Sequence, residues 1–162
     1  MAPLRSKTRK PGAQRGTASV ETAITSLLFL ATLLPIFDLS RALYRVGSLQ
    51  HATRAATRFA TTGGTTADPG GGGQLSREAS IIAMVKDLAG IDTLESAAIA
   101  ITSEAVDGTP GVGAGGPSEF VTVNVTYDVE LFTPMMEALF TGGVYRVSTS
   151  ATFLNENFAE GA

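Results

Sequence analysis

The sequence predicts an α+β fold: one long N-terminal transmembrane helix, then a small domain with an antiparallel sheet of about three strands and two short helices. Residues 17–37 contain a single charged side chain, Glu21. As a helix rising about 1.5 Å per residue they span roughly 31 Å, which matches the core of a bilayer. After residue 75, segments with helical periodicity are followed by segments of strict apolar alternation, which predicts the α+β domain.

Residues 1–16 are predicted to form a basic cytoplasmic leader without regular structure. All the acidic residues come later, and the leader holds five basic side chains, Arg5, Lys7, Arg9, Lys10 and Arg15. Lys and Arg resist translocation, so this flank is expected inside the cell and the C-terminal domain outside the cytoplasm. The acidic remainder lacks the basic surface that nucleic-acid binding requires, so we expect no nucleic-acid partner.

The long helix is predicted to cover residues 17–60, beyond the membrane span at 17–37. Apolar side chains recur there every three or four residues, at Leu39, Leu43, Val46, Leu49, Ala52, Ala56 and Ala60. Asp38, Arg41 and Arg45 are spaced for a charge ladder along the helix. A Gly-rich linker is expected at residues 61–75, before the exported domain at 76–162.

Within that domain, Ser76 and Gly90 are expected to cap a helix at 77–89 whose apolar face holds Ile81, Ile82, Val85 and Leu88. Alternating segments predict strands at 97–103, 120–131 and 145–153. Thr133 and Pro134 are expected to start a short helix that ends near residue 140.

Glu21 is the residue that points to function. A carboxylate inside an apolar span costs about 2.5–3.5 kcal/mol, so it is expected to have a partner and a role. The alternative is that Glu21 is protonated, or that its side chain snorkels to the interface, and that it has no functional role. Glu21 follows Gly16 by five positions, in the run Gly16-Thr-Ala-Ser-Val-Glu21.

This arrangement resembles the processing site of type IV pilin-like proteins, in which a prepilin peptidase cleaves after the glycine. On that resemblance the cut falls between Gly16 and Thr17 and frees the α-amine of Thr17. An ammonium on one helix is a natural counter-ion for Glu21 of a neighbour, because two charges that are costly singly in lipid are tolerated as a pair. Such pairing would stagger adjacent helices by about one turn.

The wider segment is similar to the TadE family of pseudopilins. RGTASVETAI, the apolar run and FDLSRALYRVGSLQHATRAATRFA carry the likeness, with matching positions at Asp38, Arg41, Tyr44, Ala52, Ala55, Ala56, Arg58 and Ala60. The resemblance implies a minor pilin (pseudopilin) of the tight-adherence (Tad, Flp-type) pilus, active in pilus biogenesis, adhesion and biofilm formation. Thr22 stands where many relatives carry an aromatic, and the chain is longer than a major subunit.

The partners implied are other Tad pilins, major and minor, through the N-terminal helix, together with the prepilin peptidase, the inner-membrane assembly platform and the membrane. The implied location is the bacterial inner membrane, and the pilus or cell surface after processing. One alternative is a static single-pass envelope protein with a periplasmic binding domain, which needs neither cleavage nor Glu21.

A membrane-anchored enzyme is the third hypothesis, and the residue pattern gives it no support. The chain has no Cys, and its one histidine, His51, has no neighbouring carboxylate on its helix. No nucleophile–base pair, acid–base pair or metal cluster can be assembled from these residues. We therefore expect no catalytic residues, no metal and no cofactor.

Overall fold

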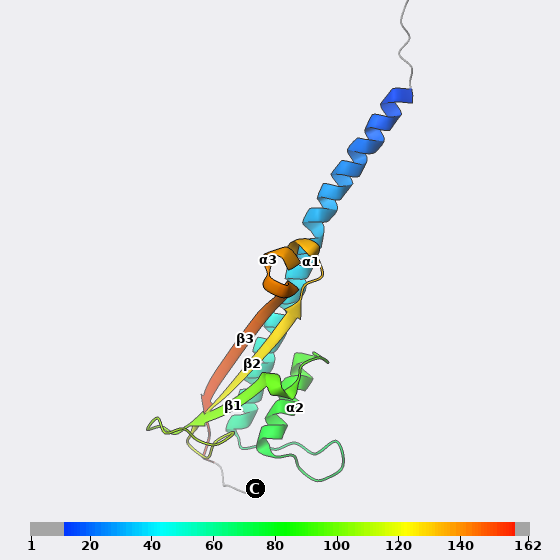
Figure 1. The fold of residues 1–162 in the computed structure, drawn as a ribbon. Helices are drawn as coiled ribbons and strands as arrows, with labels where there is room; N and C mark the ends of the chain where they lie inside the picture. The colour runs from blue at the N-terminus through cyan, green and yellow to red at the C-terminus, as the bar shows by residue number, and fades with distance from the viewer. Residues whose placement is uncertain (1–11, 158–162) are drawn as a thin grey trace, which may run out of the picture.

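The computed structural model describes the backbone of residues 12–157, and the side chains from Gly16 onward except that of Thr141. It shows one long helix followed by short helices and a three-stranded antiparallel sheet, as predicted (Figure 1). The leader residues 1–11 lie outside this range. The elements are α1 (Gly12–Thr61), α2 (Arg77–Ala89), β1 (Ile99–Glu104), β2 (Phe120–Glu130), α3 (Pro134–Leu139) and β3 (Val144–Leu154), with 3₁₀ turns at Ser96–Ala98 and Thr141–Gly143.

Helix α1 consists of two parts with different surroundings. Residues 16–37, the projecting half, extend away from the rest of the molecule, and residues 38–61, the packed half, lie against the domain (Figure 1). The helix continues through Pro35, and its first residue is Gly12. It therefore begins earlier than the predicted Thr17, because residues 12–16 contain no proline and can extend the helix that the apolar run forms.

The sheet has the strand order β1-β2-β3, and both pairings are antiparallel. Valines of β2 alternate onto its inner face and are completely buried at Val121, Val123 and Val125. Helix α1 packs against β2 and β3, and α2 packs against α1. The opposite face of the sheet is polar; there the hydroxyl groups of Thr122 and Thr152 lie 2.8 Å apart across the strands.

Helix α2 begins and ends where the sequence predicted. The Ser76 Oγ accepts a hydrogen bond from the Ala79 N–H at 3.2 Å, and Gly90 adopts the left-handed conformation (φ 59°) that glycine allows at a helix end. Its buried face was predicted only in part, because Leu88 is exposed while Ser80 and Ala89 are buried.

The packed half of α1 buries small side chains. Ala52, Ala56 and Ala60 are fully buried, as are Thr53 and Thr57 on the same side of the helix. Each of these threonines donates its hydroxyl hydrogen to the carbonyl four residues earlier, so burial leaves neither hydroxyl unsatisfied. The predicted apolar stripe is wrong at its start, since Leu39 and Leu43 are more than half exposed, whereas Leu49 is fully buried.

The Gly-rich connection between α1 and α2 is a hydrogen-bonded loop. Ala67 forms a bridge with Gln74, and the Leu75 N–H donates to the Thr66 carbonyl at 2.9 Å. The Arg77 guanidinium donates to the Ala60 carbonyl at 2.7 Å, near the C-terminus of α1, where the helix dipole favours a cation. These contacts hold the start of α2 against the end of α1.

Candidate assembly site on helix α1

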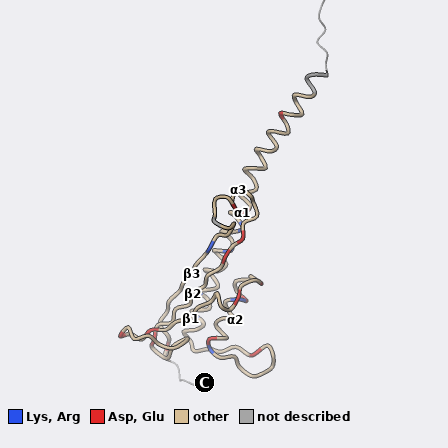
Figure 2. Tube along the Cα trace, in the orientation of Figure 1, with Lys and Arg blue, Asp and Glu red and all other residues tan. Residues whose placement is uncertain are grey.

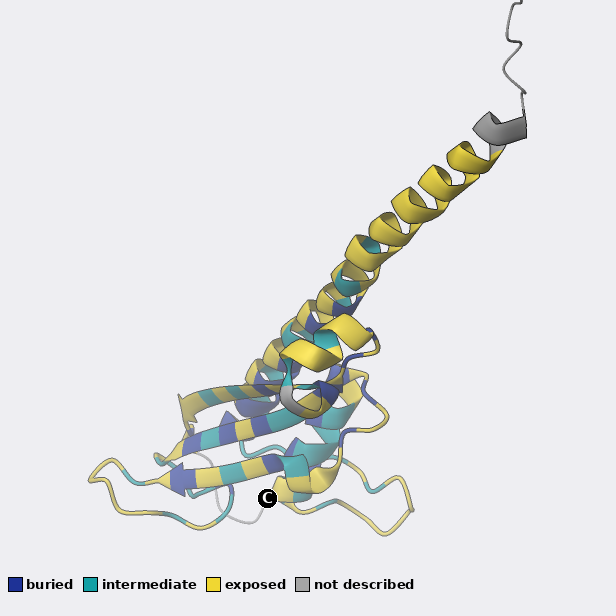
Figure 3. Ribbon diagram, turned by 45° about the horizontal axis from the view of Figure 1, so that its top comes forward, coloured by how far each residue is buried: buried dark blue, intermediate teal, exposed yellow. Residues whose placement is uncertain are grey.

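The projecting half of α1 exposes an almost continuous apolar surface. Its exposed large side chains range from 47% exposed at Leu34 to 67% at Leu27, and no residue from 16 to 37 is buried (Figure 3). A surface of this kind is unfavourable in water and requires lipid or another helix around it. The helix is long and apolar enough for a single membrane span.

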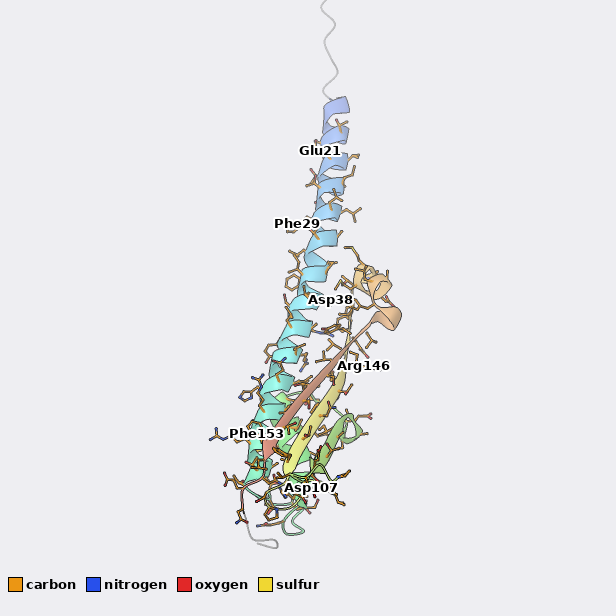
Figure 4. All side chains as sticks on the ribbon, turned by 90° about the vertical axis from the view of Figure 1, so that its left-hand side faces the viewer. Glu21, Phe29, Asp38, Asp107, Arg146 and Phe153 are labelled. Carbon is orange, nitrogen blue, oxygen red and sulfur yellow. The ribbon has the colours of Figure 1, made fainter. Side chains whose placement is uncertain are left out.

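Glu21 is the one charge in this half (Figure 2). Its side chain is exposed, and no ion pair joins it to another side chain within residues 16–157. The residue lies far out on the projecting half, about 25 Å along the helix from Asp38 (Figure 4). Any ion-pair partner of this carboxylate therefore lies outside the described side chains.

Gly16 and Thr17, the predicted processing position, lie inside the first turns of α1. Thr17 and Glu21 are four residues apart and so share one face of the helix. With Val20, Ile24 and other residues they line a shallow depression on the helix surface. Gly16 lies within the helix, where glycine is about 1 kcal/mol less favourable than alanine, which makes the helix easier to unwind at this position.

Asp38, directly after the predicted span, binds the backbone of the β2–α3 connection. Its Oδ2 atom accepts hydrogen bonds from the N–H groups of Phe132 at 3.1 Å and Thr133 at 2.8 Å, and from the Thr133 hydroxyl. The side chain is buried, with the residue 7% exposed. The hydrogen bond from the Thr133 hydroxyl is the main cause that lowers the pKa of Asp38; burial opposes it, while the backbone donors and the Arg41 charge add to it.

Arg41 and Arg45 also reach the domain. The Arg41 Nη2 donates to the Glu130 carbonyl at 2.6 Å, and its guanidinium lies 4.1 Å from the centre of the Phe132 ring. Arg45 Nη1 donates to the Gly90 carbonyl, at the end of α2, at 3.2 Å. In the structure these side chains bind the domain and do not form the predicted ladder along the helix. The one interaction kept between them is electrostatic, since the Arg41 charge helps to lower the pKa of Asp38.

Sequence reasoning did not identify Phe132 and Thr133 as the partners of Asp38. They are separated from Asp38 by more than ninety positions in the chain, so periodicity carries no signal of the contact. The sequence offers only a weak hint, which is an Asp at the end of the apolar run and a Thr-Pro helix start far along the chain. In the part of the chain that the structure describes, no three His, Asp or Glu side chains are grouped so that they could hold a metal ion.

The helix that carries these residues matches a known family. The family model for TadE-like proteins aligns with residues 16–58, from Gly16 to Arg58 of α1. Residues 16–58 are a TadE-like domain. This confirms the resemblance drawn from the sequence, and the TadE-like segment takes in the whole projecting half and most of the packed half. No curated protein and no solved structure matches the chain.

Proposed function

We propose that this chain is a minor pilin of a Tad (Flp-type) pilus, anchored by the projecting half of α1 and assembled through it. The observation that carries the proposal is a single carboxylate, Glu21, on an exposed apolar helix, five positions after Gly16 in a TadE-like segment. A charge in this position is unfavourable in lipid unless another molecule neutralises it. Assembly with other pilins supplies that neutralisation.

The proposed mechanism starts with a prepilin peptidase that cleaves between Gly16 and Thr17. The new α-amine of Thr17 then pairs with Glu21 of a neighbouring pilin helix, major or minor. Because Thr17 and Glu21 are one turn apart, the pair sets a stagger of about 5–6 Å between adjacent helices. The pair also removes two lone charges from the bilayer, which makes the assembled state more favourable than the separate helices.

The packed half of α1 then transmits the helix position to the domain. Asp38, Arg41 and Arg45 all bind backbone groups of the domain, so the domain follows the rotation of the helix. In this proposal the domain lies outside the cytoplasm, first at the inner membrane with the assembly platform and later at the pilus or cell surface. Its role is in pilus biogenesis and, through the pilus, in adhesion and biofilm formation.

N-terminal sequencing of the protein extracted from membranes tests the proposal. In a strain that has the peptidase we expect the chain to begin at Thr17, and in a strain without it at Met1 or Ala2. A Glu21→Ala variant is expected to be cleaved normally, which separates processing from assembly. An uncleaved chain in the strain that has the peptidase contradicts the proposal.

The second candidate function is a static single-pass anchor for an envelope-binding domain. One observation favours it: α1 continues without a break through Gly16 to Gly12, so the processing position is helical. This candidate requires no cleavage, and Glu21 is dispensable in it. The same sequencing experiment therefore distinguishes the two candidates.

A further inference from the structure

Helix α3 lies at the end of the domain from which the projecting half of α1 emerges (Figure 1). The position is fixed by hydrogen bonds, because Asp38 accepts from the N–H groups of Phe132 and Thr133, immediately before α3. Asp38 itself follows the last residue of the predicted span, Phe37. The start of α3 is therefore close to the level at which the span ends.

Three large apolar side chains on this short segment are more than half exposed. Phe132 is 69% exposed, Met135 55% and Leu139 70%. Met135 and Leu139 lie four residues apart and so share one side of α3, and Phe132 precedes the first residue of the helix by two positions. We call Phe132, Met135 and Leu139 the α3 apolar surface.

An adjoining side of α3 packs against the domain. Met136 and Phe140 line a small apolar cavity together with Leu39, Leu43 and Tyr145. The Phe140 and Tyr145 rings also meet edge to face, 5.7 Å apart. Because Met136 and Phe140 make these inward contacts, the exposed apolar side chains are not required for packing inside the domain.

The charges near the α3 apolar surface suit a membrane interface. The Arg41 guanidinium covers one side of the Phe132 ring, and aromatic and basic side chains together are typical of the headgroup region. The acidic residue of α3, Glu137, lies against Gly143, in the turn before β3, and two residues from Met135 and Leu139 along the helix. No acidic side chain of α3 therefore separates its apolar surface from the bilayer.

We propose that the α3 apolar surface rests in the headgroup–acyl boundary of the membrane from which α1 emerges. This inference rests on the proposed span at 17–37 and adds a second, domain-borne contact with the lipid. Lipid is favoured over a protein partner, because three side chains supply far less than the roughly 800 Å² that each partner buries in a standard protein interface. Leu39 and Leu43 of α1, which line the cavity beside Met136 and Phe140, are themselves more than half exposed, so apolar surface extends from α3 to α1 next to the span. The contact fixes the domain's tilt on the bilayer before assembly.

Site-directed spin labelling of the full-length protein tests this directly, since the chain has no native Cys. Three single variants are labelled in turn: Leu139→Cys, Leu28→Cys in the middle of the projecting half, and Val112→Cys. Val112 is 92% exposed and lies in the loop that includes Asp107, at the end of β2 farther from α3 (Figure 4). The length of β2 puts it about 35 Å from α3. The protein is reconstituted at a high lipid-to-protein ratio in phosphatidylethanolamine–phosphatidylglycerol vesicles, and collisions of each label with oxygen and with a water-soluble nickel chelate are measured.

We expect the label at position 139 to lie about 5–10 Å below the headgroup surface, the label at 28 deeper, and the label at 112 in water. If the label at 139 is as accessible to nickel as the label at 112 while the label at 28 is in lipid, the inference is overturned and the proposed span is retained. A label at 28 that is accessible to nickel overturns the span and the inference together. A label at 139 that is shielded from both reagents shows a protein occupant instead of lipid, and this also overturns the inference.

Discussion

The two halves of α1 reverse the usual relation between side-chain size and burial. The projecting half exposes Leu, Ile and Phe, including Leu27 at 67% and Phe29 at 61%, while the packed half buries Ala52, Ala56 and Ala60 completely. Large apolar side chains gain most from lipid or from neighbouring helices. Small side chains let a helix approach a sheet and a second helix closely. One continuous helix thus serves two environments, and residue size shows which part belongs to which.

The same contrast applies to the charged residues. Glu21, in the projecting half, has no ion-pair partner among residues 16–157, whereas Asp38, at the start of the packed half, has three donors from the domain. The hydrogen bonds of Asp38 hold the helix to the domain, whereas the Glu21 carboxylate is exposed and accessible to a partner outside the described residues. The difference predicts separate consequences for substitutions in the two halves.

The largest effect is expected from Glu21→Ala. Loss of a charge pair worth a few kcal/mol in lipid corresponds to at least about a tenfold loss of the assembled form. Co-purification of the variant with other pilins, and the amount of pilus on the cell, measure this loss. Unfolding of the domain is expected to be unchanged, because Glu21 contacts none of it.

Glu21→Gln is the matched variant, since it keeps the size of the side chain and removes its charge. If charge pairing drives assembly, Gln fails as Ala does. Normal assembly of both variants contradicts the proposed mechanism.

Ala56→Leu probes the packed half. Ala56 is completely buried, so three added carbons must displace the sheet or α2, which destabilises the domain by about 2–3 kcal/mol. Guanidinium unfolding of the protein in detergent micelles, followed by circular dichroism, measures the change. Leu28→Ala in the projecting half is the control, and its expected change is within about 0.5 kcal/mol. Equal effects of the two substitutions are incompatible with the division of α1 described above.

Asp38→Asn tests the junction between the halves. The amide keeps one acceptor but loses the charge, so we expect a loss of about 1 kcal/mol at neutral pH. The folded-state pKa of Asp38 is lowered from 3.8, so the carboxylate stabilises the fold above that value, and this contribution is lost as the pH falls through the lower folded pKa.

The difference in unfolding free energy between wild type and Asp38→Asn is therefore expected to shrink as the pH is lowered below 3.8. Asp107 and Asp128, whose pKa values are also lowered, titrate in both proteins and cancel in the comparison. A difference that stays constant down to acid pH excludes a charge-dependent role for Asp38.

The smallest effect is expected from Thr57→Val. The Thr57 side chain is fully buried, and its hydroxyl already donates within α1, to the Thr53 carbonyl at 2.6 Å. Replacement by a side chain of the same shape removes this bond without exposing an unsatisfied partner, so the change is expected to stay below about 1 kcal/mol. The free energy of unfolding is measured under the same conditions as for Ala56→Leu. A decrease as large as that of Ala56→Leu would show that the hydroxyl, and not close packing, holds α1 against the domain.

Local patterns predicted most of the elements. Ser76 and Gly90 gave the ends of α2, and the alternation of 120–131 gave β2 to within one residue. The exposed side of α1 was harder to predict, because Leu39 and Leu43 continue the apolar periodicity into the packed half although each stays more than half exposed. Periodicity shows that a helix has an apolar side and does not show which neighbour covers each residue of it.

By itself the sequence determined the long apolar helix, the lone carboxylate at Glu21 and its distance from Gly16, because each depends only on residues near in the chain. The tertiary structure alone decided the partners of Asp38, Arg41 and Arg45. Their positions on one helix suggested contacts with each other, yet in the fold they bind backbone N–H and C=O groups near the end of a distant strand and at the end of a distant helix. Such groups have no sequence signature, since nearly every residue carries them, and only the folded chain shows which of them lie within reach of a charge.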